Sequence, residues 1–76
     1  MIVFMKIGEF SKVSGLPIST IRYYSKIGLL RPVKKGSHWD YTLECIDQAK
    51  SVKLYKEAGF SLDTIARLLQ LKKEMH

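Results

Sequence analysis

The stretch Pro17-Ile-Ser-Thr-Ile-Arg-Tyr-Tyr-Ser-Lys-Ile-Gly28 predicts a short helix with two unlike faces. At about 100° per residue, one face gathers the residues that we expect to point to a core: Ile18, Ile21, Tyr24 and Ser25. The other face gathers Ser19, Arg22, Tyr23 and Lys26. This second face carries two cations, a hydroxyl and a phenol but no carboxylate. Such a face favours a polyanionic partner, with simple solvation of the helix as the alternative.

The charge balance of the whole chain narrows the class of partner. The 76 residues are enough for one domain spanning 1–76, and 46% of them are hydrophobic and 26% charged. The 13 lysines and arginines stand against 7 aspartates and glutamates, a formal net charge of +6. This excess favours a nucleic acid or an anionic membrane surface as partner, and it does not distinguish between the two.

Residue types suited to catalysis or metal binding are few and scattered. The 7 carboxylates, 2 histidines and 1 cysteine form no spaced set for acid–base, nucleophilic or metal chemistry. The glycines fall at turns and build no phosphate-cradling loop. We therefore expect no enzyme, no metal and no cofactor. The lone Cys45 fits a reducing cytosol and is expected to be buried as a small apolar side chain.

The first half of the chain predicts a helix-turn-helix over about 7–28. Ile7, Phe10 and Val13 recur every three residues, the pattern of an amphipathic helix, and Gly15 is suited to end it. Pro17 is expected at the first helical position of the next helix, and Gly28 at its end. Many proteins contain such a helix pair without touching DNA.

The second half predicts a small hairpin and two more helices. Residues 31–41 combine residues that favour strands with a turn at Lys35-Gly36-Ser37, which indicates a two-stranded wing. Thr42 is expected to cap a helix over about 43–58, and Ser61 one over about 61–74. The predicted fold is therefore mainly α, a winged helix-turn-helix with four short helices and a two-stranded β wing.

Several segments together resemble one known family. They are Ile7-Gly8-Glu9-Phe10-Ser11-Lys12, Thr20-Ile21-Arg22-Tyr23-Tyr24, Ile27-Gly28-Leu29-Leu30, and Ala58-Gly59-Phe60-Ser61-Leu62 followed by Ile65 and Leu68-Leu69. In this order and spacing they resemble the MerR family of bacterial transcription regulators, from Met5 to about Gln70. The resemblance implies a DNA-binding domain that acts in transcription regulation and is located in the cytoplasm, at the bacterial nucleoid.

The resemblance also implies roles for residues of the helix at 17–28. Its Arg-Tyr-Tyr motif would enter the major groove of double-stranded DNA, which assigns this role to Arg22 and Tyr23. Ser19 and Thr20 would face bases or phosphates at the start of the helix, and Lys26 would lie at its edge. Whether Arg22 pairs with a guanine or holds a phosphate stays open at this point.

Outside that helix, the resemblance implies phosphate contacts by Lys34 and Lys35 of the wing and by Lys53 of the third helix. Residues 37–39 read Ser-His-Trp where the family usually has Gly-Tyr-Arg, so the wing arginine is absent and Lys34 and Lys35 are expected to compensate. The dimerisation helix and effector domain of family regulators are absent from residues 1–76. A homodimer is thus expected only from a longer chain, and RNA polymerase only as an indirect partner at an operator or promoter.

Two other functions remain open from the sequence. The same fold would suit a small DNA-bending or recombination accessory factor, similar to an excisionase, that binds repeated sites cooperatively. A basic module that binds a protein or a membrane surface through the helix at 17–28 is the third reading. Footprinting would separate the accessory factor from the regulator, and changing Arg22 and Tyr23 to alanine together would separate DNA binding from the third reading.

Overall fold

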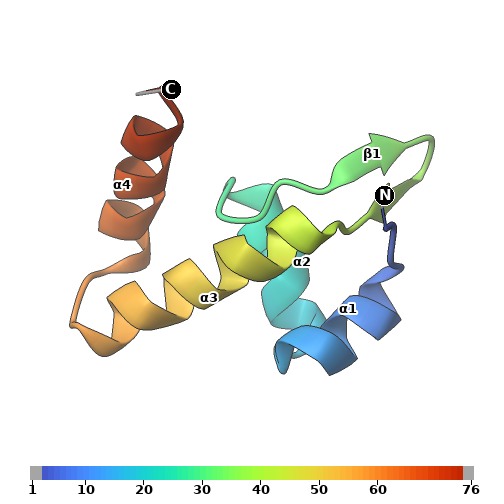
Figure 1. The fold of residues 1–76 in the computed structure, drawn as a ribbon, viewed down its shortest axis with the longest axis horizontal. Helices are drawn as coiled ribbons and strands as arrows, with labels where there is room; N and C mark the ends of the chain where they lie inside the picture. The colour runs from blue at the N-terminus through green and yellow to red at the C-terminus, as the bar shows by residue number, and fades with distance from the viewer. Residues whose placement is uncertain (1–2, 75–76) are drawn as a thin grey trace.

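The computed structural model of the protein describes residues 3–74. Along the chain it has α1 (Ile7–Ser14), α2 (Ile18–Lys26), β1 (Val33–Lys35), β2 (His38–Asp40), α3 (Leu43–Glu57) and α4 (Leu62–Glu74). Helix α3 runs through the middle, with α1, α2 and the hairpin at one end and α4 at the other (Figure 1). The expected mainly α architecture with a two-stranded wing is thereby confirmed.

The turn between α1 and α2 is tight because each end is set by a specific residue. Gly15 adopts the left-handed conformation at φ 76°, which closes α1. Pro17 is the N-cap of α2, in the extended conformation, and its carbonyl accepts the first helical bond from the Ile21 amide at 3.0 Å. The expectation that Pro17 occupies the first helical position was therefore wrong by one residue.

The end of α2 directs the chain back into the core. The helix has nine residues, about two and a half turns, and Gly28 follows at φ 87°. This conformation lets the Leu29 amide donate to the Tyr24 carbonyl at 2.9 Å, the bond of a Schellman motif. Leu29 and Leu30 are consequently turned inward, and both are buried.

The core lies where α1, α2, α3 and the end of the wing meet. Its centre is the stack of Phe10 on Tyr41, with ring centroids 4.7 Å apart. Tyr41 is among the largest fully buried side chains, and Cys45 is buried as expected. The other buried hydrophobic residues of the described chain are Met5, Ile21, Tyr24, Leu29, Leu30, Ala49, Val52 and Ile65.

Two residues expected in this core are exposed instead. Ile18 is 40% exposed and Val13 is 55% exposed. The buried direction of α2 lies between Ile21 and Tyr24, and Ile18 lies about 60° beyond Ile21, on the edge of the solvent face. Val13 lies in the last turn of α1, beyond the packing of Phe10 against the core.

The wing is an antiparallel pair with an added backbone contact from the N-terminal segment. Its register pairs Val33 with Asp40, Lys34 with Trp39 and Lys35 with His38, and Gly36 at φ 59° opens the two-residue turn. At Tyr41, the residue that follows β2, the Met5 amide and carbonyl each form a 2.7 Å hydrogen bond with the backbone. Trp39 is half-buried against the core, which supports the hairpin.

The two C-terminal helices begin differently. Thr42 occupies the N-cap of α3, but its side chain does not cap the helix. Its hydroxyl donates to the Cys45 thiol sulfur at 3.6 Å, so the expected side-chain cap was wrong. Before α4, the Ser61 hydroxyl accepts the Thr64 amide at 3.2 Å, and this expected cap is confirmed.

Candidate nucleic-acid interface

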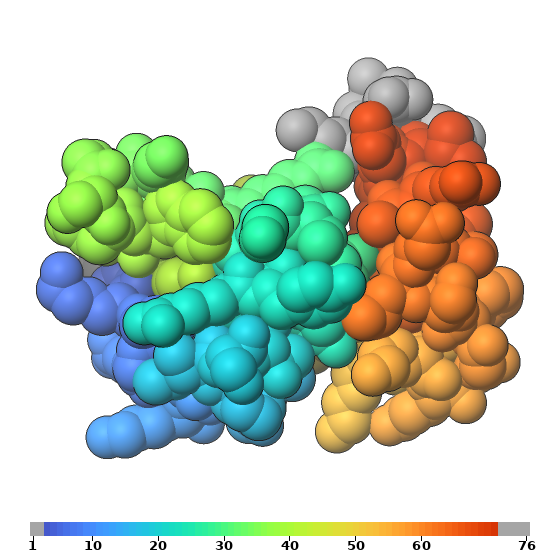
Figure 2. Space-filling model, turned by 180° about the vertical axis from the view of Figure 1, so that it is seen from behind, coloured from blue at the N-terminus to red at the C-terminus, as the bar shows by residue number. Residues whose placement is uncertain are grey.

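The outward face of α2 carries polar and cationic side chains. Ser19, Arg22, Tyr23 and Lys26 are all exposed, and Tyr23 is exposed over 53% of its surface. Thr20 is half-buried at the side of the helix. Residues 18–26 include no carboxylate, so the local field on this face is positive. In the space-filling view, α2 lies at the surface between the wing and α4 (Figure 2).

A partly buried hydrogen-bond relay holds α2 against the end of the wing. The Ser25 hydroxyl lies 2.9 Å from the Tyr41 hydroxyl and 2.8 Å from the Ile21 carbonyl. Because Ser25 has one proton and gives it to the carbonyl, Tyr41 must donate to Ser25. Burial raises the pKa of Tyr41 above its usual 10.0, against an opposing effect of the Ser25 hydrogen bond. Tyr41 is therefore a neutral donor that fixes α2 relative to the wing.

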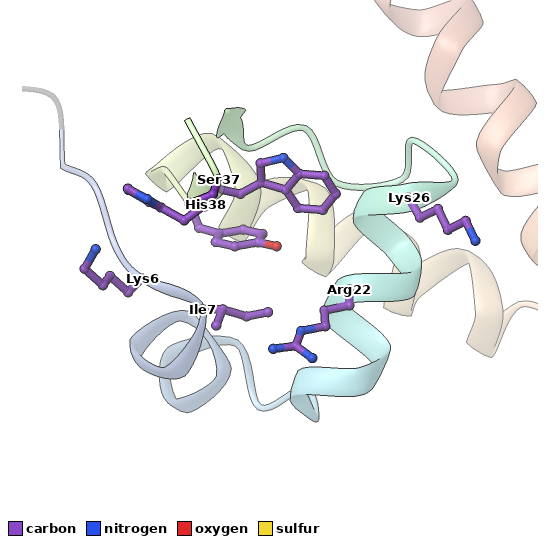
Figure 3. Close-up of a pocket in the computed structure, with 8 residues that line it drawn as sticks. Lys6, Ile7, Arg22, Lys26, Ser37 and His38 are labelled. Atoms are coloured by element: carbon purple, nitrogen blue, oxygen red, sulfur yellow. The ribbon is translucent and has the colours of Figure 1, made fainter. Parts of the chain in front are cut away.

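A groove of about 490 Å³ lies between the start of α1, α2 and the wing (Figure 3). Its apolar surface comes from Ile7, Trp39 and Tyr41, and the cations at its edges are Lys6, Arg22 and Lys26. Ser37 and His38 line it from the wing. An apolar channel edged by ammonium and guanidinium groups is suited to a chain that alternates sugars and phosphates.

The wing places its own cations on the surface. Lys34 and Lys35 are both exposed, and Lys34 lies opposite Trp39 in the hairpin. The Lys35 ammonium lies 4.5 Å from the centroid of the Phe4 ring, within the range of a cation–π contact. His38, opposite Lys35, has its Nε2 atom 3.7 Å from an Asp40 oxygen.

The structure brings together some of the residues expected to contact DNA and leaves others apart. Arg22 and Lys26 line the groove, whereas Lys53 is exposed on α3 and is not among the groove-lining residues. Lys6 and His38 line the groove but were missed from the sequence. His38 could have been found from the hairpin register, which puts it next to the turn. No local pattern pointed to Lys6.

Residues 3–74 show neither a metal-ligand cluster nor a membrane-spanning helix. Within residues 3–74, no group of three or more His, Cys, Asp or Glu side chains is placed to hold a metal ion. No helix there combines the length and apolar character needed to cross a bilayer.

A short cationic helix presented by a second helix, with a basic hairpin beside it, defines a winged helix-turn-helix domain of the DNA-binding type. Residues 5–72 match the model of the MerR helix-turn-helix family of regulatory proteins. The chain belongs to this family.

Individual relatives agree with this assignment. The chain is 41% identical over 68 residues to the transcriptional regulator HmrR of Rhizobium leguminosarum bv. viciae, covering 88% of this chain and 53% of that protein. It is 42% identical over 74 residues to the mercuric resistance operon regulatory protein of Shigella flexneri, covering 95% and 51%. The chain therefore spans about half the length of these relatives.

A solved structure extends the likeness to three dimensions. The crystal structure of a MerR-family transcriptional regulator from Bacillus cereus superposes with a TM-score of 0.78 at 30% identity. The match covers 90% of this chain and 52% of that one. These relatives are transcription regulators by name.

Proposed function

We propose that this domain binds a specific sequence of double-stranded DNA and thereby acts in transcription regulation. The outward face of α2 enters the major groove, and the wing follows the phosphate backbone. The observation that carries the proposal is the continuous carboxylate-free face of Ser19, Arg22, Tyr23 and Lys26, which lies beside the basic wing. A major groove about 12 Å wide accepts a helix of this size.

Within this proposal, the exposed side chains have distinct tasks. Arg22 reads a guanine edge through two hydrogen bonds, a contact worth about 1–3 kcal/mol of discrimination. Ser19 and Thr20 contact the bases or phosphates nearest the start of α2, and Tyr23 and Lys26 position the helix on the backbone. The lysines of the wing, Lys34 and Lys35, and Lys53 on α3 each contact a phosphate.

The proposed partners follow from the geometry of paired sites on DNA. Two copies of a helix-turn-helix reach adjacent major grooves when their centres lie about 34 Å apart. We place one copy on each half of a palindromic operator or promoter, with a homodimer only if a longer chain supplies a dimerisation helix. One copy alone binds weakly, and RNA polymerase is affected only indirectly, through the shape of the promoter. The protein acts in the cytoplasm, at the nucleoid, where bacterial DNA lies.

The experiment that tests this function is selection of bound duplexes from a random DNA pool at two salt concentrations. The 76-residue chain should enrich a defined motif, and its affinity should fall steeply as salt rises. The double variant Arg22→Ala with Tyr23→Ala should lose the enrichment with its fold unchanged, since both side chains are exposed. Lys56→Ala is the matched control, because Lys56 is an exposed cation in the last turn of α3. Enrichment that survives the double variant would overturn the proposal.

A further inference from the structure

We infer that the segment Val3–Lys6 is part of the DNA-binding surface, and that Lys6 contacts a phosphate in the groove between α2 and the wing. This inference rests on the proposed function and adds a contact residue outside both the recognition helix and the wing. Three observations support it: the hydrogen-bonded backbone of the segment, the residues that line the groove, and the cation–π contact between Phe4 and Lys35.

The backbone on the N-terminal side of Lys6 is fixed. Met5 is 5% exposed and forms two 2.7 Å hydrogen bonds with the backbone of Tyr41, at the end of the wing. Lys6 follows in the extended conformation as the N-cap of α1, and its carbonyl accepts the Phe10 amide at 2.9 Å. The Lys6 backbone is therefore held at the edge of the groove between two ordered elements. Only the side chain then remains to be ordered when the ammonium binds, which lowers the entropy cost of that contact.

The groove has the chemistry of a channel for one DNA strand. Lys6 stands on one side, and Arg22 and Lys26 stand on the other side along α2 (Figure 3). Ile7 and the rings of the wing make the apolar surface between them, and no carboxylate is among the lining residues that the structure describes. Phosphates placed at the cationic edges would leave their deoxyribose rings on the apolar surface.

The groove continues the face of α2 that we place in the major groove. Arg22 and Lys26 belong to both surfaces, since each is exposed on α2 and lines the groove. A duplex seated on α2 therefore brings one of its strands toward Lys6. Under this proposal the groove takes a strand of the same duplex and not a separate ligand.

The same segment also contacts a lysine of the wing. The Phe4 ring is 43% exposed and lies under the Lys35 ammonium, at 4.5 Å from centroid to nitrogen. This contact restricts the long Lys35 side chain. The segment thus positions two cations of the surface. The Met5 backbone positions the neighbouring Lys6, and the Phe4 ring contacts Lys35.

The test is a salt titration of duplex binding by the whole 76-residue chain, measured by fluorescence anisotropy on the selected duplex and on an unrelated one. Lys6→Ala should weaken binding to both duplexes by the same factor and reduce the salt slope by about 1. Lys6→Arg should restore the slope. Lys56→Ala is the control, a cation at the end of α3 far from the wing (Figure 1).

The outcomes separate this inference from the proposed function. If the wild-type chain binds and Arg22→Ala impairs it, but Lys6→Ala keeps the wild-type slope, then the inference about Lys6 is wrong and the function stands. If the wild-type chain shows no salt-dependent binding to any duplex, both fall. Thermal unfolding of Lys6→Ala should match wild type, because the side chain is exposed and makes no capping bond.

Discussion

The relay from Tyr41 to Ser25 to the Ile21 carbonyl gives an asymmetric prediction about stability. Tyr41 is 1% exposed, and Ser25 is its side-chain hydrogen-bond partner, at 2.9 Å. Ser25→Ala leaves the Tyr41 hydroxyl buried without a partner. Tyr41→Phe removes the hydroxyl, and Ser25 still donates to the Ile21 carbonyl at 2.8 Å. The serine change should therefore cost more than the tyrosine change.

The magnitudes follow from the cost of an orphaned donor. A buried hydroxyl without a partner costs about 1–3 kcal/mol, whereas loss of one satisfied hydrogen bond costs about 0.5–1.5 kcal/mol. In the double variant no polar atom of the pair is orphaned, so its cost should fall below the sum of the two single changes by about 1 kcal/mol. For a domain of this size, each kcal/mol lowers Tm by about 4–8 °C.

The assay is thermal and urea unfolding of the wild type, both single variants and the double variant, followed by circular dichroism. Ser19→Ala on the same helix is the control, because Ser19 is exposed and reports the gain in helix propensity alone. Additive costs, or a Tyr41→Phe cost larger than that of Ser25→Ala, would refute the assigned direction of the relay. A loss of stability without a large change in DNA affinity is expected for Ser25→Ala, since Ser25 is not among the exposed side chains of α2 that we place on DNA.

Two further predictions concern pH and the glycines. Because burial raises the pKa of Tyr41, the folded state keeps a proton that the unfolded chain releases near pH 10.0, so stability is fully present below that pH and is lost as pH rises above it. Urea unfolding at pH 8 and at about pH 11 should show a smaller loss for Tyr41→Phe than for wild type, and equal losses would contradict this cause. Gly28→Ala should cost about 1–2 kcal/mol of stability because φ is 87° there. Gly8 lies inside α1, contrary to the expectation that the glycines fall at turns, and the space at its Cβ is open, so Gly8→Ala should raise the stability by about 0.5–1 kcal/mol. Melting temperatures of the two variants that shift in the same direction would show that the backbone conformation is not the cause.

The helices were predictable because their ends depend on local residues. Gly15 and Gly28 have positive φ in the structure, and each had marked the end of a helix in the sequence. Periodicity alone did not show how far along a helix the apolar face stays covered. Ile18 and Val13, which lie in terminal turns, were therefore placed in the core although both are exposed. Local pattern predicts which residues share a face, but packing decides which part of that face is covered.

The candidate site was predictable only along α2. Arg22, Tyr23 and their neighbours share one face because of helix geometry, which sequence spacing contains. The groove depends instead on the backbone pairing of Met5 with Tyr41, a contact between distant parts of the chain that no motif records. Lys6 acquires its place from that pairing, and for this reason it was missed.

The central claim is that the cationic face of α2 seats in the major groove of a duplex, and a nuclear magnetic resonance titration of the labelled chain with the selected duplex tests it most directly. The amides of Ser19, Arg22, Tyr23 and Lys26 should shift progressively, together with those of the wing, while the last turn of α3 stays unchanged. Unperturbed α2 signals at saturating duplex would contradict the claim.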